Sequence, residues 1–273
     1  MMQEIRTSTA RAAEEFPPPR YRPHEREPWD MRASGIAVED APPSAVVSAV
    51  ESGVCARRIP ELPRNARDSL QSMGLARGGV LTNAAALLFC STAAPLIACR
   101  CYDSPEKILV DAADFAGPLL AALQGACVFV ARNIGLAFGS SSRRASFLPF
   151  LSAALPEIVL NALVHRDYRS ILAVKVVVRP GLVEVSNPGC FPSSGLRLAR
   201  TPREYAQAAL EEGGPGRNAL LVQALYRFGV LDAAGAGLAY AAGACALCGL
   251  DIRFENVGRC AVVSVVRRRR RHV

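Results

Sequence analysis

The sequence predicts an α+β fold, in which helices cover one face of a mixed sheet and a smaller α+β region precedes that sandwich. Three observations lead to this prediction. The chain has 273 residues, which is enough for one large domain or two ordinary ones. Half of the residues (51%) are hydrophobic, so a sizeable core can form. In the second half, the segments follow one another in the order helix, strand, strand, helices, strand, strand.

Composition divides the chain into four stretches. The first is expected to be flexible, because proline is mixed with charge and little can be buried; Trp29 is the one residue expected to anchor it. A loop of glycine, serine and arginine, Gly139–Arg144, marks the boundary between the two folded regions. The predicted stretches are residues 1–34 (flexible), 35–143 (smaller α+β region), 144–266 (sandwich) and 267–273 (basic tail).

Proline and glycine set the limits of the helices expected in the first folded region. The apolar segment Val80–Cys90 fits a helix or a strand equally well, because its periodicity does not separate the two. The other elements expected here are helices Pro43–Glu51 and Arg64–Met73, strands Leu96–Tyr102 and Lys107–Asp111, and the long helix Asp114–Phe138.

In the second folded region, Pro180-Gly181 separates two apolar segments and predicts a hairpin. The glycine-rich stretch Gly213–Gly216 predicts a loop. The elements expected are, in order, helix Leu155–His165, strands Leu172–Arg179 and Leu182–Ser186, helices Pro202–Leu210, Asn218–Phe228 and Gly237–Leu247, and strands Asp251–Glu255 and Cys260–Val266.

The net charge is +8, and nearly all of the positive charge is arginine. Arginine suits phosphate and carboxylate recognition, so the charge is compatible with nucleotide or nucleic-acid partners. The same bias toward arginine also follows from a GC-rich genome. The charge alone therefore leaves both interpretations open.

Nine scattered cysteines, several of them in apolar runs such as those around Cys90 and Cys127, are typical of reduced, buried thiols. The N-terminal residues are polar and proline-rich and show no signal-peptide pattern. The longest apolar stretch, Phe115–Val130, is interrupted and falls short of the roughly 20 residues that a spanning helix needs. We therefore expect a soluble, cytoplasmic protein with no membrane partner.

Three polar residues lie on one stripe of the predicted helix Leu155–His165. Glu157, Asn161 and His165 are spaced i, i+4 and i+8, and the apolar residues cluster on the opposite side. The helix therefore packs with one face and presents a carboxylate, an amide and an imidazole toward something polar. A solvated helix face is the alternative that this pattern alone does not remove.

The segment Leu155–Tyr168, LPEIVLNALVHRDY, resembles the E-x-x-x-N-A-x-x-H-R-D-Y block of Schlafen/AlbA-type transcriptional regulators, which are also described as RecG-like helicase-related proteins. The resemblance runs from roughly Arg58 to Val266, and five blocks in the same order are far more specific than any one of them. The other four blocks are Leu81–Phe89, Glu184–Gly189, Gly216–Leu221 and Phe228–Leu238.

The C-terminal module of that family is related to GHKL (Bergerat) ATPases, so the resemblance implies a GHKL-like nucleotide-binding module over residues 144–266, with ATP and Mg²⁺ as cofactors. It implies that Asn161 holds Mg²⁺ against the phosphates, that Glu157 is the general base, and that His165 belongs to the same cofactor site. Mg²⁺ prefers oxygen ligands and keeps several waters, and a carboxylate one turn away reaches such a water.

The resemblance also assigns cofactor-binding residues outside this helix. Asn187 and Gly189 are expected to line the base pocket. Gly235 and Gly237 are expected to let backbone N–H groups approach a phosphate at a helix start, and Arg217 to add positive charge. The alternative for the glycines is turn geometry without a ligand.

The chain departs from the family pattern in ways that favour ATP binding over ATP hydrolysis. Cys190 and Ala234 replace residues common in the family, and the stretch Gly213–Gly216 is short for a glycine-rich lid. The acidic strand that usually opens the DNA-binding domain is not found. Residues 35–143 therefore resemble only the end of an AlbA-type domain followed by a linker.

The basic tail supplies a second candidate for nucleic-acid binding. It is either a phosphate-binding arm or a solvated terminus. We expect a transcriptional regulator that binds ATP-Mg and nucleic acid; the alternatives are an ATPase coupled to nucleic-acid remodelling and a binding or structural protein that kept the fold without the ligand. Homo-oligomerisation is left open. The candidate nucleic-acid-binding residues are Arg267, Arg268, Arg269, Arg270 and Arg271.

Overall fold

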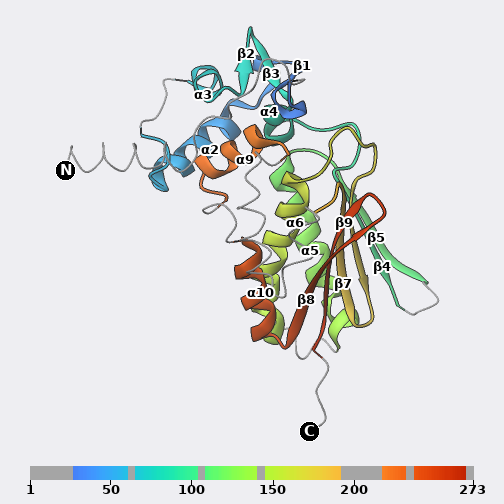
Figure 1. Cartoon of the computed structure of the whole chain (residues 1–273). Helices are drawn as coiled ribbons and strands as arrows, with labels where there is room; N and C mark the ends of the chain where they lie inside the picture. Colours follow the sequence, from blue (N-terminus) through green and yellow to red (C-terminus); the bar gives the residue numbers. More distant parts are fainter. Residues whose placement is uncertain are drawn as a thin grey trace. The chain divides into compact units, whose positions relative to one another are not determined.

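The chain folds into two compact units, each built on its own sheet (Figure 1). The first unit comprises the chain up to Thr92 together with 215–233, and the second comprises the remainder. The α+β prediction is therefore confirmed. The computed structural model describes residues 27–60, 65–103, 108–139, 145–191, 217–231 and 237–268.

The first unit contains a three-stranded antiparallel sheet in the order β1-β3-β2, with helices packed around it. Arg58 joins the end of α2 to the end of α9: it donates to the Tyr226 carbonyl (2.9 Å) and stacks over the Tyr226 ring at 4.3 Å. The elements are η1 (Trp29–Met31), β1 (Ala33–Ala37), η2 (Val38–Asp40), α2 (Pro43–Cys55), α3 (Ala66–Ser72), β2 (Ala76–Arg77), β3 (Val80–Thr82), α4 (Asn83–Phe89) and α9 (Ala219–Arg227).

The ambiguous apolar segment Val80–Cys90 is both a strand and a helix. Residues up to Thr82 pair with β1 and β2, and the Thr82 hydroxyl then accepts a hydrogen bond from the Ala85 N–H (3.3 Å). A threonine that caps an N–H group starts a helix at this point, because it satisfies a donor that has no partner in the first turn. Periodicity missed the division because both halves are apolar.

A buried carboxylate ties the start of the described chain to α9. Asp30 is 0% exposed, and its Oδ2 accepts hydrogen bonds from the backbone N–H groups of Leu220 (2.7 Å) and Leu221 (3.1 Å). The expectation of a flexible segment up to residue 34 does not hold for residues 27–34, which are folded. Composition cannot reveal a single polar residue that caps a helix almost 200 positions away.

The second unit contains a six-stranded mixed sheet in the order β5-β4-β6-β7-β9-β8. The neighbours β4 and β6 are parallel, and the other four pairs are antiparallel. The strands are β4 (Ile97–Tyr102), β5 (Leu109–Phe115), β6 (Val174–Arg179), β7 (Leu182–Pro188), β8 (Leu250–Val257) and β9 (Cys260–Arg267).

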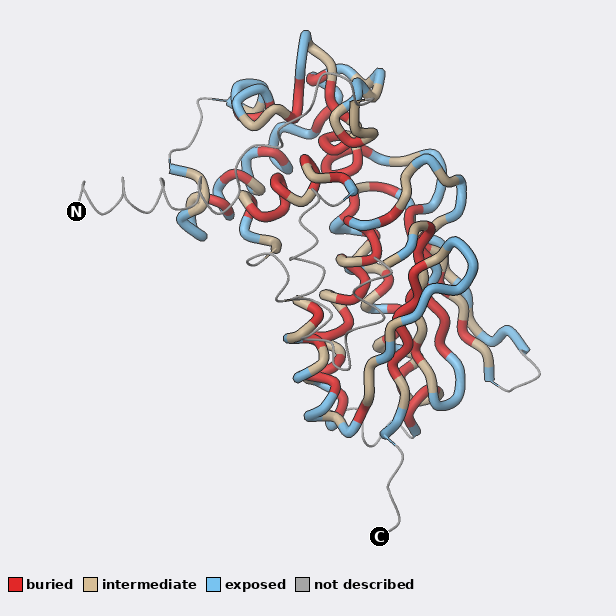
Figure 2. Tube along the Cα trace, in the orientation of Figure 1, coloured by how far each residue is buried: buried red, intermediate tan, exposed pale blue. Residues whose placement is uncertain are grey.

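Helices cover one face of this sheet (Figure 1). Because β4 and β6 run parallel, the chain must cross over between them, and α5 and α6 form that crossover. The buried residues lie where the helices meet the sheet (Figure 2). The helical elements are α5 (Leu119–Phe138), the π-helix η4 (Phe150–Ala154), α6 (Leu155–Val164) and α10 (Gly237–Leu247).

Helix α5 starts later than predicted. β5 runs on to Phe115, and Gly117 and Pro118 separate it from the helix. The twenty residues of α5 are long and apolar enough to cross a membrane by length and composition, a test that the core helix of a soluble protein also passes. Eight of them are buried, and the helix packs on β4 and β6.

The compact units divide the chain differently from the predicted domains. The division falls after Thr92, because β4 and β5 complete the six-stranded sheet. Helix α9 belongs to the first unit, although the chain on either side of it belongs to the second. The expected helix Pro202–Leu210 and loop Gly213–Gly216 lie outside the described residues.

Burial of Asp30 predicts a pH-dependent stability of the first unit. Desolvation raises the pKa of this carboxyl above its ordinary 3.8, although the hydrogen bonds from Leu221 and Leu220 lower it. The folded state therefore holds the proton more tightly than the unfolded state. The protonated Asp30 contributes its full free energy of stabilisation below the pKa that this carboxyl has in the unfolded chain. That contribution is lost as the pH rises through the pKa that it has in the folded protein.

We expect the melting temperature of Asp30→Asn, relative to the parent, to rise as pH increases above 3.8, because the amide has no proton to lose. Thermal unfolding at several pH values measures this difference. Glu51→Gln, which removes an exposed carboxyl on α2, is the control and should give a flat difference. A flat profile for Asp30→Asn would contradict the prediction.

Candidate functional site

The predicted polar stripe is the least buried part of α6. Seven of the ten residues of this helix are buried, whereas Glu157 and Asn161 are half-buried. His165 is exposed at the C-cap, where its N–H donates to the Asn161 carbonyl (3.0 Å). The helix therefore packs as predicted and leaves one carboxylate and one amide at its less covered side.

The carboxylate of Glu157 lies against the first residue of α10, Gly237. A Cβ atom at position 237 would overlap with Oε2 of Glu157, so the carboxylate would have to shift if any other residue stood there. The first turn of a helix has free N–H groups and a partial positive charge, which favour an anion. The structure thus brings together two of the residues that the resemblance assigned to one site.

The end of β7 supplies a buried amide beside these helices. Asn187 is 6% exposed and shares its face of the strand with Val183 and Val185, the buried side covered by α6. Its Nδ2 donates to the Pro188 carbonyl (3.1 Å). Gly189 follows with a φ of +113°, a value that strongly favours glycine.

A backbone hydrogen bond fixes the end of α6 against the end of β7: the Asp167 N–H donates to the Pro188 carbonyl (2.8 Å). Glu157, Asn161 and Asn187 therefore belong to elements that are tied together within one unit. Their relative placement depends on the loop that follows α6.

That loop is held by two residues whose roles sequence reasoning missed. The buried Arg166 donates to the carbonyls of Leu172 (3.0 Å) and Ser170 (3.1 Å), and Tyr168 donates its hydroxyl to the Leu163 carbonyl (2.9 Å). The guanidinium lies 4.8 Å from the Tyr168 ring, and burial lowers the pKa of Arg166. The H-R-D-Y letters were noticed as a motif, but only the fold shows that Arg166 and Tyr168 position the chain.

The other predicted site residues belong to the first unit, to the end of β9 or to segments outside the described residues. Arg217 is exposed next to α9 in the first unit, and Gly235 lies outside the described residues. In the predicted tail, Arg267 is the last residue of β9 and pairs with Leu250, while Arg268 donates to Asp251 (2.9 Å). Arg267 therefore belongs to an interior strand of the sheet, and Arg268 follows it in an ion pair. Arg269, Arg270 and Arg271 lie outside the described residues.

The chemistry of the site is that of one carboxylate and two amides. Among the residues that the structure describes, no group of three or more His, Cys, Asp or Glu residues is arranged to hold a metal ion by itself. The residues fit a Mg²⁺ ion that arrives with a nucleotide, because such an ion takes most of its ligands from phosphate and water and needs few from protein. The Asn161 amide oxygen is of the required type.

All nine cysteines are free thiols, as the sequence predicts. Burial raises the pKa of Cys99 and Cys245 to about 12 and that of Cys127 to about 11. These thiols stay protonated near neutral pH and have little nucleophilic character. Cys55 and Cys190, by contrast, are exposed.

We expect a thiol-disulfide reagent such as dithiobis-nitrobenzoate at pH 8 to modify Cys55 and Cys190 rapidly in the folded protein. Cys99 and Cys245 should react only after unfolding, because they are both buried and protonated. Peptide mapping of the modified sites after a brief exposure measures the order. Early modification of Cys99 in folded protein would show that the β4 core is open.

The chain was compared with protein families, with curated proteins and with solved structures. No family model matches the chain, and no curated protein matches it. Among solved structures, it is similar to the crystal structure of the DIP2311 protein from Corynebacterium diphtheriae, with a TM-score of 0.63 and 19% sequence identity. That similarity covers 90% of this chain and 41% of the DIP2311 chain, so this chain spans less than half of that protein's length. At this sequence identity the similarity shows a shared fold and carries no information about function.

Proposed function

We propose that the second unit binds ATP with Mg²⁺ in a GHKL-like manner, and that the chain is a nucleotide-dependent regulator that contacts nucleic acid. The observation that carries the proposal is the Glu157 carboxylate held against Gly237, with Asn161 one turn further along the same helix. The ordered sequence blocks supply the GHKL assignment, and the sandwich of helices on a mixed sheet is consistent with it.

Each residue has a distinct role in this proposal. The Asn161 amide oxygen is a ligand for Mg²⁺, which when bound neutralises phosphate charge. Glu157 orients a water and accepts its proton at a carboxylate oxygen. Asn187, buried at the end of β7, offers an amide to the base of the nucleotide. The exposed His165 lies at the end of α6, on the side of the site where the Asp167 N–H bonds to the Pro188 carbonyl.

The geometry makes the metal necessary in this proposal. Glu157 already lies at the start of α10, where the resemblance also places a phosphate. Two anions at one helix start repel each other, and the partial charge of the helix is too small to neutralise both. A divalent cation held by the Asn161 amide oxygen would offset that repulsion. ATP without Mg²⁺ should therefore bind more weakly than ATP-Mg.

Nucleic-acid contact is the second part of the proposal, and the net charge of +8 supports it. Arg267 is the last residue of β9, and Arg268 forms an ion pair with Asp251, so full use of the tail requires breaking that pair. The free thiols fit a reducing compartment such as the cytoplasm.

We expect Asn161→Ala to weaken ATP-Mg binding about 10- to 100-fold, because it removes a polar contact to a charged group. Glu157→Gln should keep binding and abolish any turnover, since it keeps a side chain of the same size beside Gly237 and removes the proton acceptor. Isothermal titration and phosphate release measure the two effects. If the parent protein shows no heat with millimolar ATP-Mg, the nucleotide proposal fails; equal turnover with and without Glu157 would remove the ATPase alternative.

A matched pair of glycine substitutions tests the carboxylate contact directly. Gly237→Ala forces Glu157 to move, and we expect ATP-Mg affinity to fall about tenfold, which corresponds to about 1.4 kcal/mol. Gly243→Ala lies on the same helix, where an added Cβ meets no atom within 4 Å. It should leave affinity unchanged and stabilise α10 by roughly 0.5–1 kcal/mol.

Titration calorimetry compares the affinities, and thermal unfolding verifies that both variants fold. Equal ATP-Mg affinities for Gly237→Ala and Gly243→Ala would contradict the proposed role of the Glu157–Gly237 contact. Loss of affinity in both would point to a general effect of changing α10.

A further inference from the structure

We propose that the free edge of β5 pairs antiparallel with the same edge of a second copy of this chain, which gives a two-fold dimer with a sheet continuous across both copies. This inference is independent of nucleotide binding, because it uses β5 and α5 and none of the residues assigned to the nucleotide. It rests on four features of the second unit: the two sheet edges, the charges on β5, the groove beside it and its self-complementary sequence.

The two edges of the six-stranded sheet differ in protection. At the β8 edge, the Asn256 side chain exchanges two hydrogen bonds with the Phe191 backbone (2.9 and 3.1 Å), and Arg253 and Glu255 are exposed. Cover of this kind and exposed charge prevent edge-to-edge pairing. Over the part of the chain that the structure describes, no element pairs with β5 on the side away from β4.

The β5 edge contains no buried residue, and its exposed apolar residues lie at its start. Leu109 and Val110 are 51% and 47% exposed, and the preceding Ile108 is 57% exposed. A bulge between Leu109 and Asp111 disturbs the pairing with β4 at one end, so the regular edge runs over Asp111–Phe115. Unprotected apolar edges of this kind accept another strand, because their backbone N–H and C=O groups lack protein partners.

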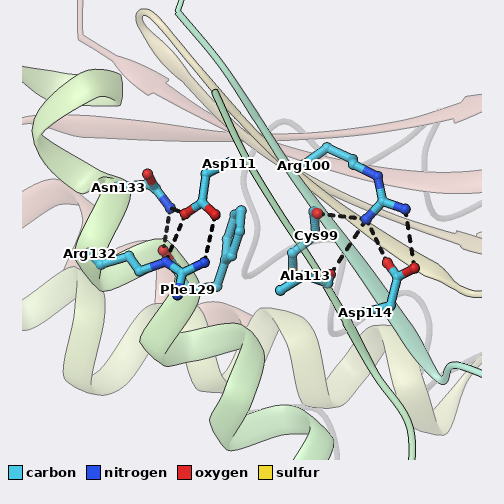
Figure 3. A network of polar contacts seen from close by, with 8 residues as sticks. All are labelled: Cys99, Arg100, Asp111, Ala113, Asp114, Phe129, Arg132 and Asn133. Atoms are coloured by element: carbon cyan, nitrogen blue, oxygen red, sulfur yellow. Dashed lines mark hydrogen bonds and ion pairs between the residues drawn. The ribbon is translucent and has the colours of Figure 1, made fainter. Parts of the chain in front are cut away.

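The two acidic residues of β5 are neutralised within the chain (Figure 3). Asp111 accepts two hydrogen bonds from Arg132 (2.7 Å each) and one from Asn133 (2.7 Å), on the side covered by α5. Asp114 forms an ion pair with Arg100 on the opposite face. These contacts lower the pKa of both carboxyls. The edge therefore carries no net charge that would repel a second copy.

A groove of about 360 Å³ runs along α5 beside this edge. Ala121 and Gly125, which have small side chains or none, line this groove. Phe115 packs so closely on Gly125 that a Cβ atom at position 125 would overlap with the Phe115 ring. Val128, one turn further on, is 59% exposed. A strand added to β5 would extend over this groove, and in a two-fold dimer the small residues allow the two α5 helices to approach across the seam.

The sequence of β5 is compatible with pairing to itself. A two-fold axis at Ala112 places Asp111 opposite Ala113, and an axis at Ala113 places Ala112 opposite Asp114. Neither register sets one carboxylate opposite another, and both put alanine at the closest approach. Because a two-fold interface uses the same patch on both copies, this compatibility points to a second copy as the occupant.

Sedimentation velocity of the full chain at about 1 to 100 µM tests the proposal, together with three single substitutions. We expect the parent to have twice the chain mass of 29.1 kDa. Ala112→Lys places two ammonium groups across the seam, and Val128→Lys puts a charge in the groove; each should weaken dimerisation at least about tenfold. Both positions are exposed, so the monomer should fold.

Val257→Lys is the matched control, because Val257 is 55% exposed on the opposite edge strand, β8. It should leave the dimer intact. A monomeric parent at about 100 µM, or a dimer that survives both Ala112→Lys and Val128→Lys, overturns the proposal. Loss of the dimer with Val257→Lys alone would assign the interface to β8 and overturn it equally. The monomeric variants should bind ATP-Mg with the affinity of the parent protein. Sedimentation therefore tests the dimer, and titration with ATP-Mg tests nucleotide binding independently of it.

Discussion

The contact between the Glu157 carboxylate and Gly237 is the constraint on which the candidate site depends. It places the start of α10 against the less buried side of α6, and a side chain at the first position of that helix would displace the carboxylate. The amide of Asn161 lies one turn along from the carboxylate. The candidate site thus follows from how two helices of the second unit pack.

The candidate site also requires a polar group from the sheet, the amide of Asn187 at the end of β7, to lie beside α6. The N–H of Asp167 bonds to the Pro188 carbonyl and so holds the end of β7 beside the end of α6. The loop between them is kept in shape by Arg166, which satisfies two carbonyls, and by Tyr168, which satisfies a third. Buried polar groups of this kind are costly unless paired, so their pairing is what makes the loop geometry unique.

Sequence reasoning predicted most elements and the polar stripe on α6, because helical and strand periodicity are local properties. It failed where the determinant was not local. Asp30 caps α9 from a distant part of the chain, and the start of α5 was placed too early because Asp114 belongs to an ion pair with Arg100 on the sheet. The division after Thr92 depends on β4 joining the second sheet, which no periodicity reveals. The roles given to Asn161 and Asn187 came from family resemblance, and geometry supplied only their surroundings.

Helix α9 illustrates how a segment can fold with one unit although its neighbours in sequence belong to the other. Its first turn is held by the buried Asp30, which accepts hydrogen bonds from the Leu220 and Leu221 N–H groups. Because a buried acceptor is costly unless it is paired, this contact favours the placement of α9 in the first unit. The first unit therefore acquires a helix from a distant part of the chain through one polar residue, and the division into units does not follow the order of the sequence.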